Sequence, residues 1–130
     1  MTKTKQIFEL SAPYNNQFQG VSMRALFVCS AGILRSPTAA TVAAKLGFNA
    51  RSCGSDIECA LVPVSANLIF WATRIYFLNR ENYNETLLVF KDQTLTLEEL
   101  QDKAVVWNIE DQFNFMDPVL VAEIERLLTT

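Results

Sequence analysis

Four short runs of strand-forming residues alternate along this chain with segments of helical character, and this alternation limits the fold more than any other feature. The runs cover residues 25–28, 48–53, 74–78 and 104–107. Strands that alternate with helices predict βαβ units, in which neighbouring strands run parallel. The first run is apolar throughout, which is typical of a strand buried on both faces. We therefore predict an α/β fold with a mainly parallel sheet.

The segment after the first strand has the signals of a helix. It is rich in alanine, Ser36 is a suitable N-cap, and Pro37 fits the first helical position. Gly47 provides a C-terminal stop. Further helices are expected over residues 63–71 and 80–90, from a capping box at residues 96–99, and from Asp117–Pro118 onward.

The length of 130 residues suits one domain. We predict that residues 23–130 form it and that residues 1–22, rich in Gln, Asn, Ser and Thr, are an N-terminal extension that is loosely ordered or packed on the surface. The start of the chain lacks an apolar signal region, and no apolar run is long enough to span a bilayer. The expected location is therefore the cytoplasm, with no membrane partner.

Composition excludes several classes of function. The chain has no histidine, which rules out Ser-His and Cys-His nucleophile pairs and most zinc-enzyme ligand sets. Its net charge is −3 and its Lys and Arg residues are scattered, so we expect no nucleic-acid partner. The three cysteines, Cys29, Cys53 and Cys59, form no CxxC pair or disulfide framework and are interpreted as reduced thiols.

The chemistry concentrates in residues 29–35, Cys-Ser-Ala-Gly-Ile-Leu-Arg, which we call the Cys29 loop. A loop between a buried strand and a helix start can direct its backbone N–H groups into one anion-binding concavity. A cation and a helix N-terminus favour the thiolate form of a cysteine, so Cys29 would be the nucleophile and Arg35 a two-pronged phosphate clamp. Ser36 could donate a hydrogen bond to the thiolate. The residues expected to surround the phosphate are Ser30, Ala31, Gly32, Ile33, Leu34 and Ser36.

Residues 28–39, Val-Cys-Ser-Ala-Gly-Ile-Leu-Arg-Ser-Pro-Thr-Ala, resemble the phosphate loop of the low-molecular-weight protein tyrosine phosphatases, and most of all a short bacterial branch of that family. Residues 71–79 and 109–113 resemble a strand and a loop of the same family, and the matches span most of residues 24–128. The resemblance implies a three-layer α/β/α fold with a four-stranded parallel sheet. It also implies hydrolysis of phosphomonoesters, typically aryl ones, without a metal or other cofactor.

Expelling the leaving group requires a proton donor, and without histidine this falls to a carboxylic acid. Asp111 and Asp117 both follow the last strand, at the carboxyl edge of the sheet where ligands bind in such folds. Asp111 matches the family's acid in its Ile-x-Asp context and is preferred, whereas Asp117 is better explained as an N-cap. Phe113 is a candidate for contact with a substrate ring, and it fits the core equally well.

The loop asparagine of the family is missing, with Gly32 or Ile33 in its neighbourhood, which could slacken the loop. Three functions therefore stay open. The first is a phosphatase that acts on a phosphorylated small molecule or a phosphotyrosine protein, as a monomer or weak homodimer. The second is a phosphate- or phosphoprotein-binding module with little or no turnover. The third is an arsenate reductase, for which Cys53 and Cys59 would be the only relay thiols.

Overall fold

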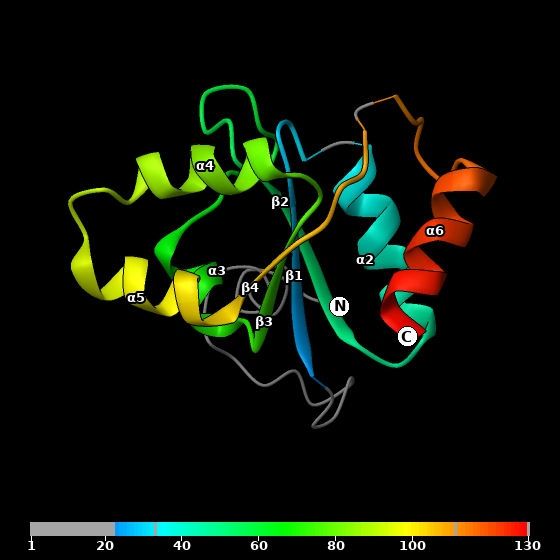
Figure 1. Ribbon diagram of the computed structural model, residues 1–130, viewed down its shortest axis with the longest axis horizontal. Helices are drawn as coiled ribbons and strands as arrows, with labels where there is room; N and C mark the ends of the chain where they lie inside the picture. The colour runs from blue at the N-terminus through cyan, green and yellow to red at the C-terminus, as the bar shows by residue number, and fades with distance from the viewer. Residues whose placement is uncertain (1–22, 33, 111, 130) are drawn as a thin grey trace, which may run out of the picture.

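The computed structural model describes residues 23–32, 34–110 and 112–129, which are built around one sheet (Figure 1). Its strands are β1 (Arg24–Cys29), β2 (Asn49–Gly54), β3 (Arg74–Phe77) and β4 (Ala104–Val106). They lie in the order β2-β1-β3-β4, and every neighbouring pair is parallel. The predicted four-stranded parallel sheet is therefore confirmed. The prediction for residues 1–22 falls outside the described residues.

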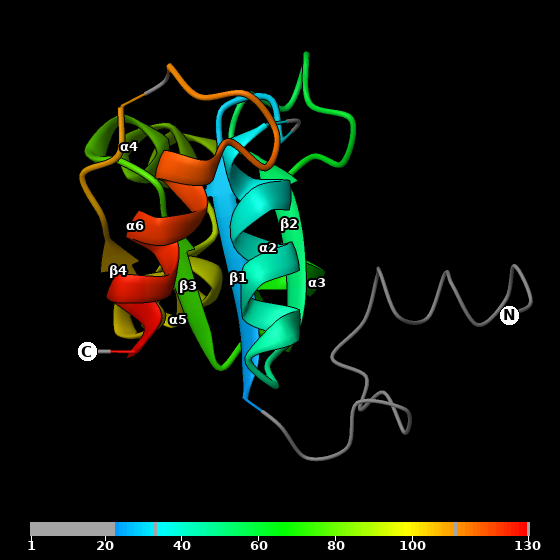
Figure 2. The same cartoon turned by 90° about the vertical axis from the view of Figure 1, so that its right-hand side faces the viewer.

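Helices cover both faces of the sheet, which gives three layers (Figures 1 and 2). One face packs against α2 (Arg35–Lys45) and α6 (Pro118–Thr129). The other packs against α3 (Ala66–Trp71), α4 (Arg80–Val89) and α5 (Thr94–Lys103). In the described part of the chain, no helix is both long and apolar enough to cross a membrane.

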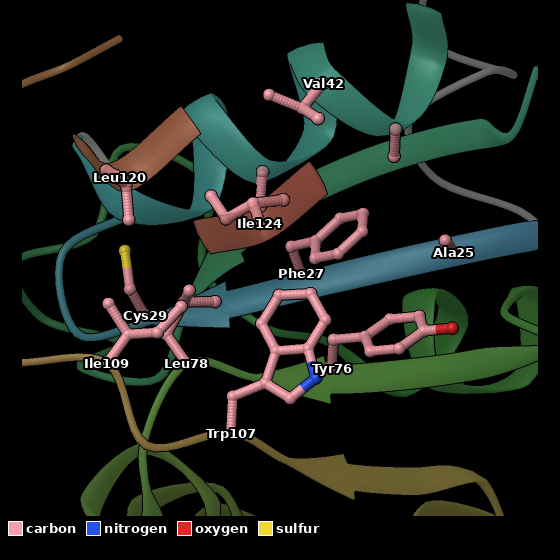
Figure 3. Close-up of a cluster of buried hydrophobic side chains, with 12 residues drawn as sticks. Ala25, Phe27, Cys29, Val42, Tyr76, Leu78, Trp107, Ile109, Leu120 and Ile124 are labelled. Atoms are coloured by element: carbon pink, nitrogen blue, oxygen red, sulfur yellow. The ribbon is translucent and has the colours of Figure 1, made fainter. Parts of the chain in front are cut away.

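Strand β1 is central and buried, and its side chains alternate between the two layers. Ala25, Phe27 and Cys29 belong to the core under α2 and α6, where Phe27 stacks on Tyr76 with ring centroids 5.0 Å apart (Figure 3). Leu26 and Val28 belong to the core under the other three helices. The fully apolar run seen in the sequence thus results from burial on both faces.

Two helix starts differ from the prediction. Helix α2 begins at Arg35 with Leu34 as its N-cap and no side-chain cap, so Ser36 and Pro37 lie inside its first turn. Proline is tolerated there because the N–H groups of a first turn have no intrahelical partner. Helix α5 begins at Thr94, not at a capping box at residues 96–99, because the Thr96 hydroxyl donates to the Gln93 side chain instead. The other predicted strands and helices agree to within three residues, and the largest difference is at α3, which begins at Ala66 and not at residue 63.

Candidate active site

The Cys29 loop lies at the carboxyl edge of the sheet, between β1 and α2. Two other connections reach the same end of the molecule (Figures 1 and 2). We call them the β2 segment, residues 55–62, and the β4 segment, residues 108–117. The loop is therefore flanked by segments that come from both sides of the sheet.

Backbone hydrogen bonds from the β2 segment fix the direction of the loop's peptide groups. Ser55 N donates to Cys29 O (2.8 Å), Asp56 N to Ser30 O (2.9 Å) and Leu61 N to Ala31 O (3.4 Å). In a trans peptide the carbonyl and the next N–H point in opposite directions. The N–H groups of Ser30, Ala31 and Gly32 therefore point away from the β2 segment, to the side on which an anion-binding nest would have to form.

Two glycines make this close backbone contact possible. Gly32 has φ +70°, and a Cβ there would lie 2.9 Å from the carbonyl carbon of Cys53 and from Gly54 N. A Cβ on Gly54 would lie 2.6 Å from Ser30 O and 2.5 Å from the Cβ of Ala60. Gly32 thus supplies the left-handed conformation that the loop needs at this point. Ile33, the other residue proposed for the family's asparagine position, lies outside the described residues.

Ser36 joins the nucleophile to the neighbouring strand. Its Oγ lies 3.0 Å from Cys29 Sγ and donates to Cys53 O at 3.3 Å. Cys29 is only 4% exposed and Ser36 is fully buried. A hydroxyl can rotate to suit its partners, so Ser36 can accept from the Cys29 thiol or donate to the thiolate. The sequence prediction of a Cys29–Ser36 contact agrees with this geometry.

Cys53 does not face Cys29. It lies in the core under α3, α4 and α5, whereas Cys29 lies in the core under α2 and α6. Burial, with the nearby Cys29 as a smaller cause, raises the pKa of Cys53 far above that of a free cysteine. Cys59 is exposed on the β2 segment. Cys53 is therefore a buried, inert thiol, as its apolar surroundings favour.

Arg35 is 2% exposed and reaches across to the β4 segment. Its Nη1 donates to Ile109 O at 2.9 Å. A guanidinium has five N–H donors in one plane, so it can join a backbone carbonyl and an anion at the same time. Arg35 therefore connects the start of α2 with the segment that carries the proposed acid.

A second contact joins α2 to the β4 segment. Met116 N donates to Thr38 Oγ1 (2.8 Å), and Thr38 Oγ1 donates to Leu34 O (2.7 Å). Met116 has φ 59°, an unusual backbone conformation for a residue with a side chain. Asp117 accepts from Val119 N at 2.9 Å, which confirms its predicted role as the N-cap of α6. Asp111 lies outside the described residues.

A cavity of 740 Å³ lies between the β4 segment and α6. Phe113 lines it together with Ile109 and Val119, and also packs against the core under α2 and α6. None of the described residues that line this cavity belongs to the Cys29 loop, so it is not where the thiol would attack. The structure thus brings Cys29, Ser36 and the loop backbone together, whereas Phe113 lines a separate cavity on the β4 segment.

Comparison with solved structures finds proteins of the same architecture. An arginine phosphatase, YwlE from Geobacillus stearothermophilus, matches at 19% identity and a TM-score of 0.57, over 82% of this chain and 86% of its own. The tyrosine phosphatase Wzb from Escherichia coli K30 matches at 13% identity and 0.56, over 83% and 91%. A low-molecular-weight protein tyrosine phosphatase from T. tengcongensis matches at 17% and 0.54, over 82% and 92%. The chain has the low-molecular-weight phosphatase fold.

Comparisons of the amino-acid sequence with known families and curated proteins find no match. No protein-family model matches the chain, and no curated protein matches it. The low-molecular-weight phosphatase fold is therefore formed here by a sequence with little similarity to those of its structural neighbours.

Four polar residues that contact the Cys29 loop or its neighbours were missed by the sequence reasoning: Thr38, Ser55, Asn82 and Glu85. Asn82 and Glu85 come from α4, more than fifty residues away along the chain. Their i, i+3 spacing on a helix that follows β3 was visible, and in a low-molecular-weight phosphatase fold that helix begins at the carboxyl edge of the sheet. No local pattern, however, indicates that their shared face meets Ser30.

Proposed function

We propose that this protein is a phosphomonoester hydrolase that acts through a cysteinyl-phosphate intermediate. The observation that carries the proposal is the position of Cys29. Its thiol ends a buried strand, beneath a loop whose N–H groups are turned away from the β2 segment, and beside Ser36 Oγ at 3.0 Å. The 11-residue helix α2 begins at the end of the same loop and adds a positive partial charge.

In the first step the Cys29 thiolate attacks the phosphorus in line with the ester oxygen. An S–P bond forms, the P–O bond breaks, and its electron pair leaves with the ester oxygen, which takes a proton from Asp111. The N–H groups of the Cys29 loop and the Arg35 guanidinium bind the phosphoryl oxygens. Their charge and dipoles stabilise the negative charge of the transition state.

In the second step a water molecule attacks the phosphorus and gives a proton to the Asp111 carboxylate. The S–P bond breaks and its electrons return to Cys29, which leaves as a thiolate. Ser36 donates its hydroxyl hydrogen to that sulfur, which the 3.0 Å contact allows. The products are inorganic phosphate and the free alcohol or phenol, and the enzyme is restored without a metal or other cofactor.

We propose an aryl phosphate, such as a phosphotyrosine side chain in a protein, as the substrate. Phe113 is half-buried and Phe115 is 51% exposed on the β4 segment, where an aromatic ring of a substrate could pack against them. Structural neighbours named as a tyrosine phosphatase and an arginine phosphatase support the reaction class. They differ in whether an oxygen or a nitrogen leaves the phosphorus, so both substrates belong in the test.

A phosphate-binding module without turnover is the second candidate. It is favoured by the Cys29 loop itself, in which Gly32 gives the turn its positive φ but has no side chain with which to hold the loop in shape for turnover. Arsenate reduction has less support. It requires a disulfide relay, and Cys29 and Cys53 lie in the cores on opposite faces of the sheet.

The test is hydrolysis of para-nitrophenyl phosphate in the presence of a chelator by wild type, Cys29→Ser and Cys59→Ser. We expect turnover in wild type and Cys59→Ser, where the exposed thiol is a matched control, and none in Cys29→Ser. Intact-mass spectrometry after a rapid acid quench is expected to show one added phosphoryl group in wild type and in Cys59→Ser. Phosphoarginine, tested in parallel, distinguishes the two leaving groups.

Hydrolysis that survives in Cys29→Ser would contradict the thiolate mechanism. Folded wild type that binds phosphate and releases no nitrophenol would favour the binding module instead.

A further inference from the structure

Two polar side chains outside the Cys29 loop, those of Asn82 and Glu85, bond to Ser30, and a third, that of Ser55, joins them through Glu85. Ser30 Oγ donates to Glu85 Oε1 at 3.2 Å and accepts from Asn82 Nδ2 at 3.0 Å. Ser55 Oγ donates to the same Glu85 oxygen at 3.0 Å. Asn82 is fully buried and Ser55 is 2% exposed, so these bonds are shielded from water on one side. The Ser30 hydroxyl is thus fixed as both donor and acceptor.

The helix that supplies this network is itself held in place. Asn82 Oδ1 accepts from Asn79 N and Asn79 Oδ1 accepts from Asn82 N, which forms a capping box at the start of α4. The box uses the oxygen of the Asn82 amide, and the nitrogen of the same amide reaches Ser30. Residues three apart share one face of a helix, which brings Asn82 and Glu85 to Ser30 together.

The loop requires support from outside because of its own composition. Gly32 gives the turn its positive φ but has no side chain with which to hold the loop, and glycine has the most conformational freedom to lose. The β2 segment holds the loop carbonyls, and its first residue, Ser55, is bonded to Glu85 as well. Glu85 therefore adds a side-chain link to these backbone bonds, because one of its oxygens accepts from Ser30 of the loop and from Ser55 of the β2 segment.

We propose that Glu85 is a positioning residue, which holds Ser30 and Ser55 so that the Cys29 loop keeps its anion-binding shape. The proposal rests on the proposed function for its catalytic meaning, and it concerns phosphate binding directly. Glu85 acts through Ser30 and touches no reacting atom. What matters is the oxygen that accepts two hydroxyls, because a negative charge near the loop would by itself oppose the binding of a phosphate anion.

This difference makes the role testable with two substitutions. Glu85→Gln removes the charge but keeps an oxygen that can accept from the Ser30 and Ser55 hydroxyls. Glu85→Ala removes the charge and that oxygen together. The measurement is the dissociation constant of inorganic phosphate by calorimetry, with para-nitrophenyl phosphate hydrolysis and the melting temperature recorded on the same samples. Glu98→Ala, at an exposed carboxylate on α5, is the matched control.

We expect Glu85→Ala to weaken phosphate binding about tenfold, which corresponds to about 1.4 kcal/mol. Glu85→Gln is expected to bind as wild type does or more tightly, and Glu98→Ala as wild type does. Ser30→Ala is expected to weaken binding too. Adding Glu85→Ala to it is expected to cost less than Glu85→Ala does in wild type, because the contact between Ser30 and Glu85 is already broken and only that with Ser55 is left to lose.

Tighter binding in both Glu85→Gln and Glu85→Ala would overturn the proposal and leave only an effect of charge. Unchanged binding in Glu85→Ala with a lowered melting temperature would overturn it in favour of a purely structural role. The proposed function has its own test: it is wrong if wild type binds phosphate without hydrolysing the ester. In that case the phosphate dissociation constants of the Glu85 variants still test the positioning role.

Discussion

The β2 segment and the β4 segment flank the same loop, but they are attached to it in different ways. The β2 segment donates backbone N–H groups to three loop carbonyls. The described hydrogen bonds between the β4 segment and α2 use side chains of α2: Arg35 donates to Ile109 O, and Thr38 Oγ1 accepts from Met116 N. One side is fixed by main-chain geometry and the other depends on individual side chains. We infer that the first determines how phosphate is bound and the second how the acid is presented.

The largest effect is expected on the β4 side, from Asp111→Asn. Loss of a general acid lowers the rate by about 10²-fold or more, and most for poor leaving groups that need the proton. The measurement is kcat for phenyl phosphate against kcat for para-nitrophenyl phosphate, and we expect the first to fall more.

Asp117→Asn is the control, because asparagine caps a helix as well as aspartate does and α6 should be retained. If Asp117→Asn instead lowered the rate as far as Asp111→Asn, the assignment of the acid would be wrong.

Gly54→Ala tests the β2 side. Its Cβ would meet Ser30 O at 2.6 Å, so the loop carbonyl has to move. We expect the free energy of unfolding to fall by about 1–3 kcal/mol, as for overpacked cores. A shift of the nest on the scale of 1 Å would lower kcat/KM by about 10²-fold. Urea denaturation and hydrolysis of para-nitrophenyl phosphate measure the two effects.

Gly47→Ala is the control for Gly54→Ala, because it makes the same change at a glycine that has no close neighbours. Gly47 has φ +96° at the end of α2, and a Cβ there would meet nothing within 4 Å. It is expected to lose about 1 kcal/mol of stability from the left-handed backbone and to keep its activity per folded molecule. Equal losses of activity in both variants would contradict a special role for the contact between Gly54 and the loop.

Thr38→Val breaks one of the two side-chain contacts of the β4 segment. The hydroxyl that accepts from Met116 N and donates to Leu34 O is lost, while the shape is kept. A lost hydrogen bond of this kind costs about 1 kcal/mol, so we expect kcat to fall about fivefold, again more for phenyl phosphate. Phosphate affinity should change less than kcat, because the β2 side is untouched.

Thr41→Val is the control for Thr38→Val, since Thr41 makes the same type of bond one turn later, to Pro37 O, without reaching the β4 segment. A fall in phosphate affinity as large as the fall in kcat would show that the two sides of the loop are not independent.

The sequence predicted the layers of this molecule well because burial leaves a local record. The apolar run in β1 and the apolar residues at helical spacing in α6 each indicate which side chains are buried. The Cys29 loop is contiguous in the chain, so its pattern can be recognised in the sequence. The supports of the loop leave no such record. Glu85 and Asn82 look like ordinary polar helix residues, and the need for glycine at position 54 comes from Ser30 O and Ala60, which only the fold brings close.

The smallest expected effect tests whether the β2 segment is as fixed as its hydrogen bonds indicate. Asp56 raises the pKa of the exposed Cys59 by its charge and by a hydrogen bond. Alkylation requires the thiolate, so the raised pKa slows the reaction of Cys59 at neutral pH. Asp56→Asn is expected to speed alkylation by iodoacetamide and to move its pH midpoint downward. The rate is followed by peptide mass spectrometry, with a smaller change expected for Glu58→Gln, because Glu58 is the weakest of the causes that raise the pKa. If Asp56→Asn left the rate unchanged, Asp56 would not stay beside Cys59, and the β2 segment would be held less firmly than its bond from Asp56 N to Ser30 O implies.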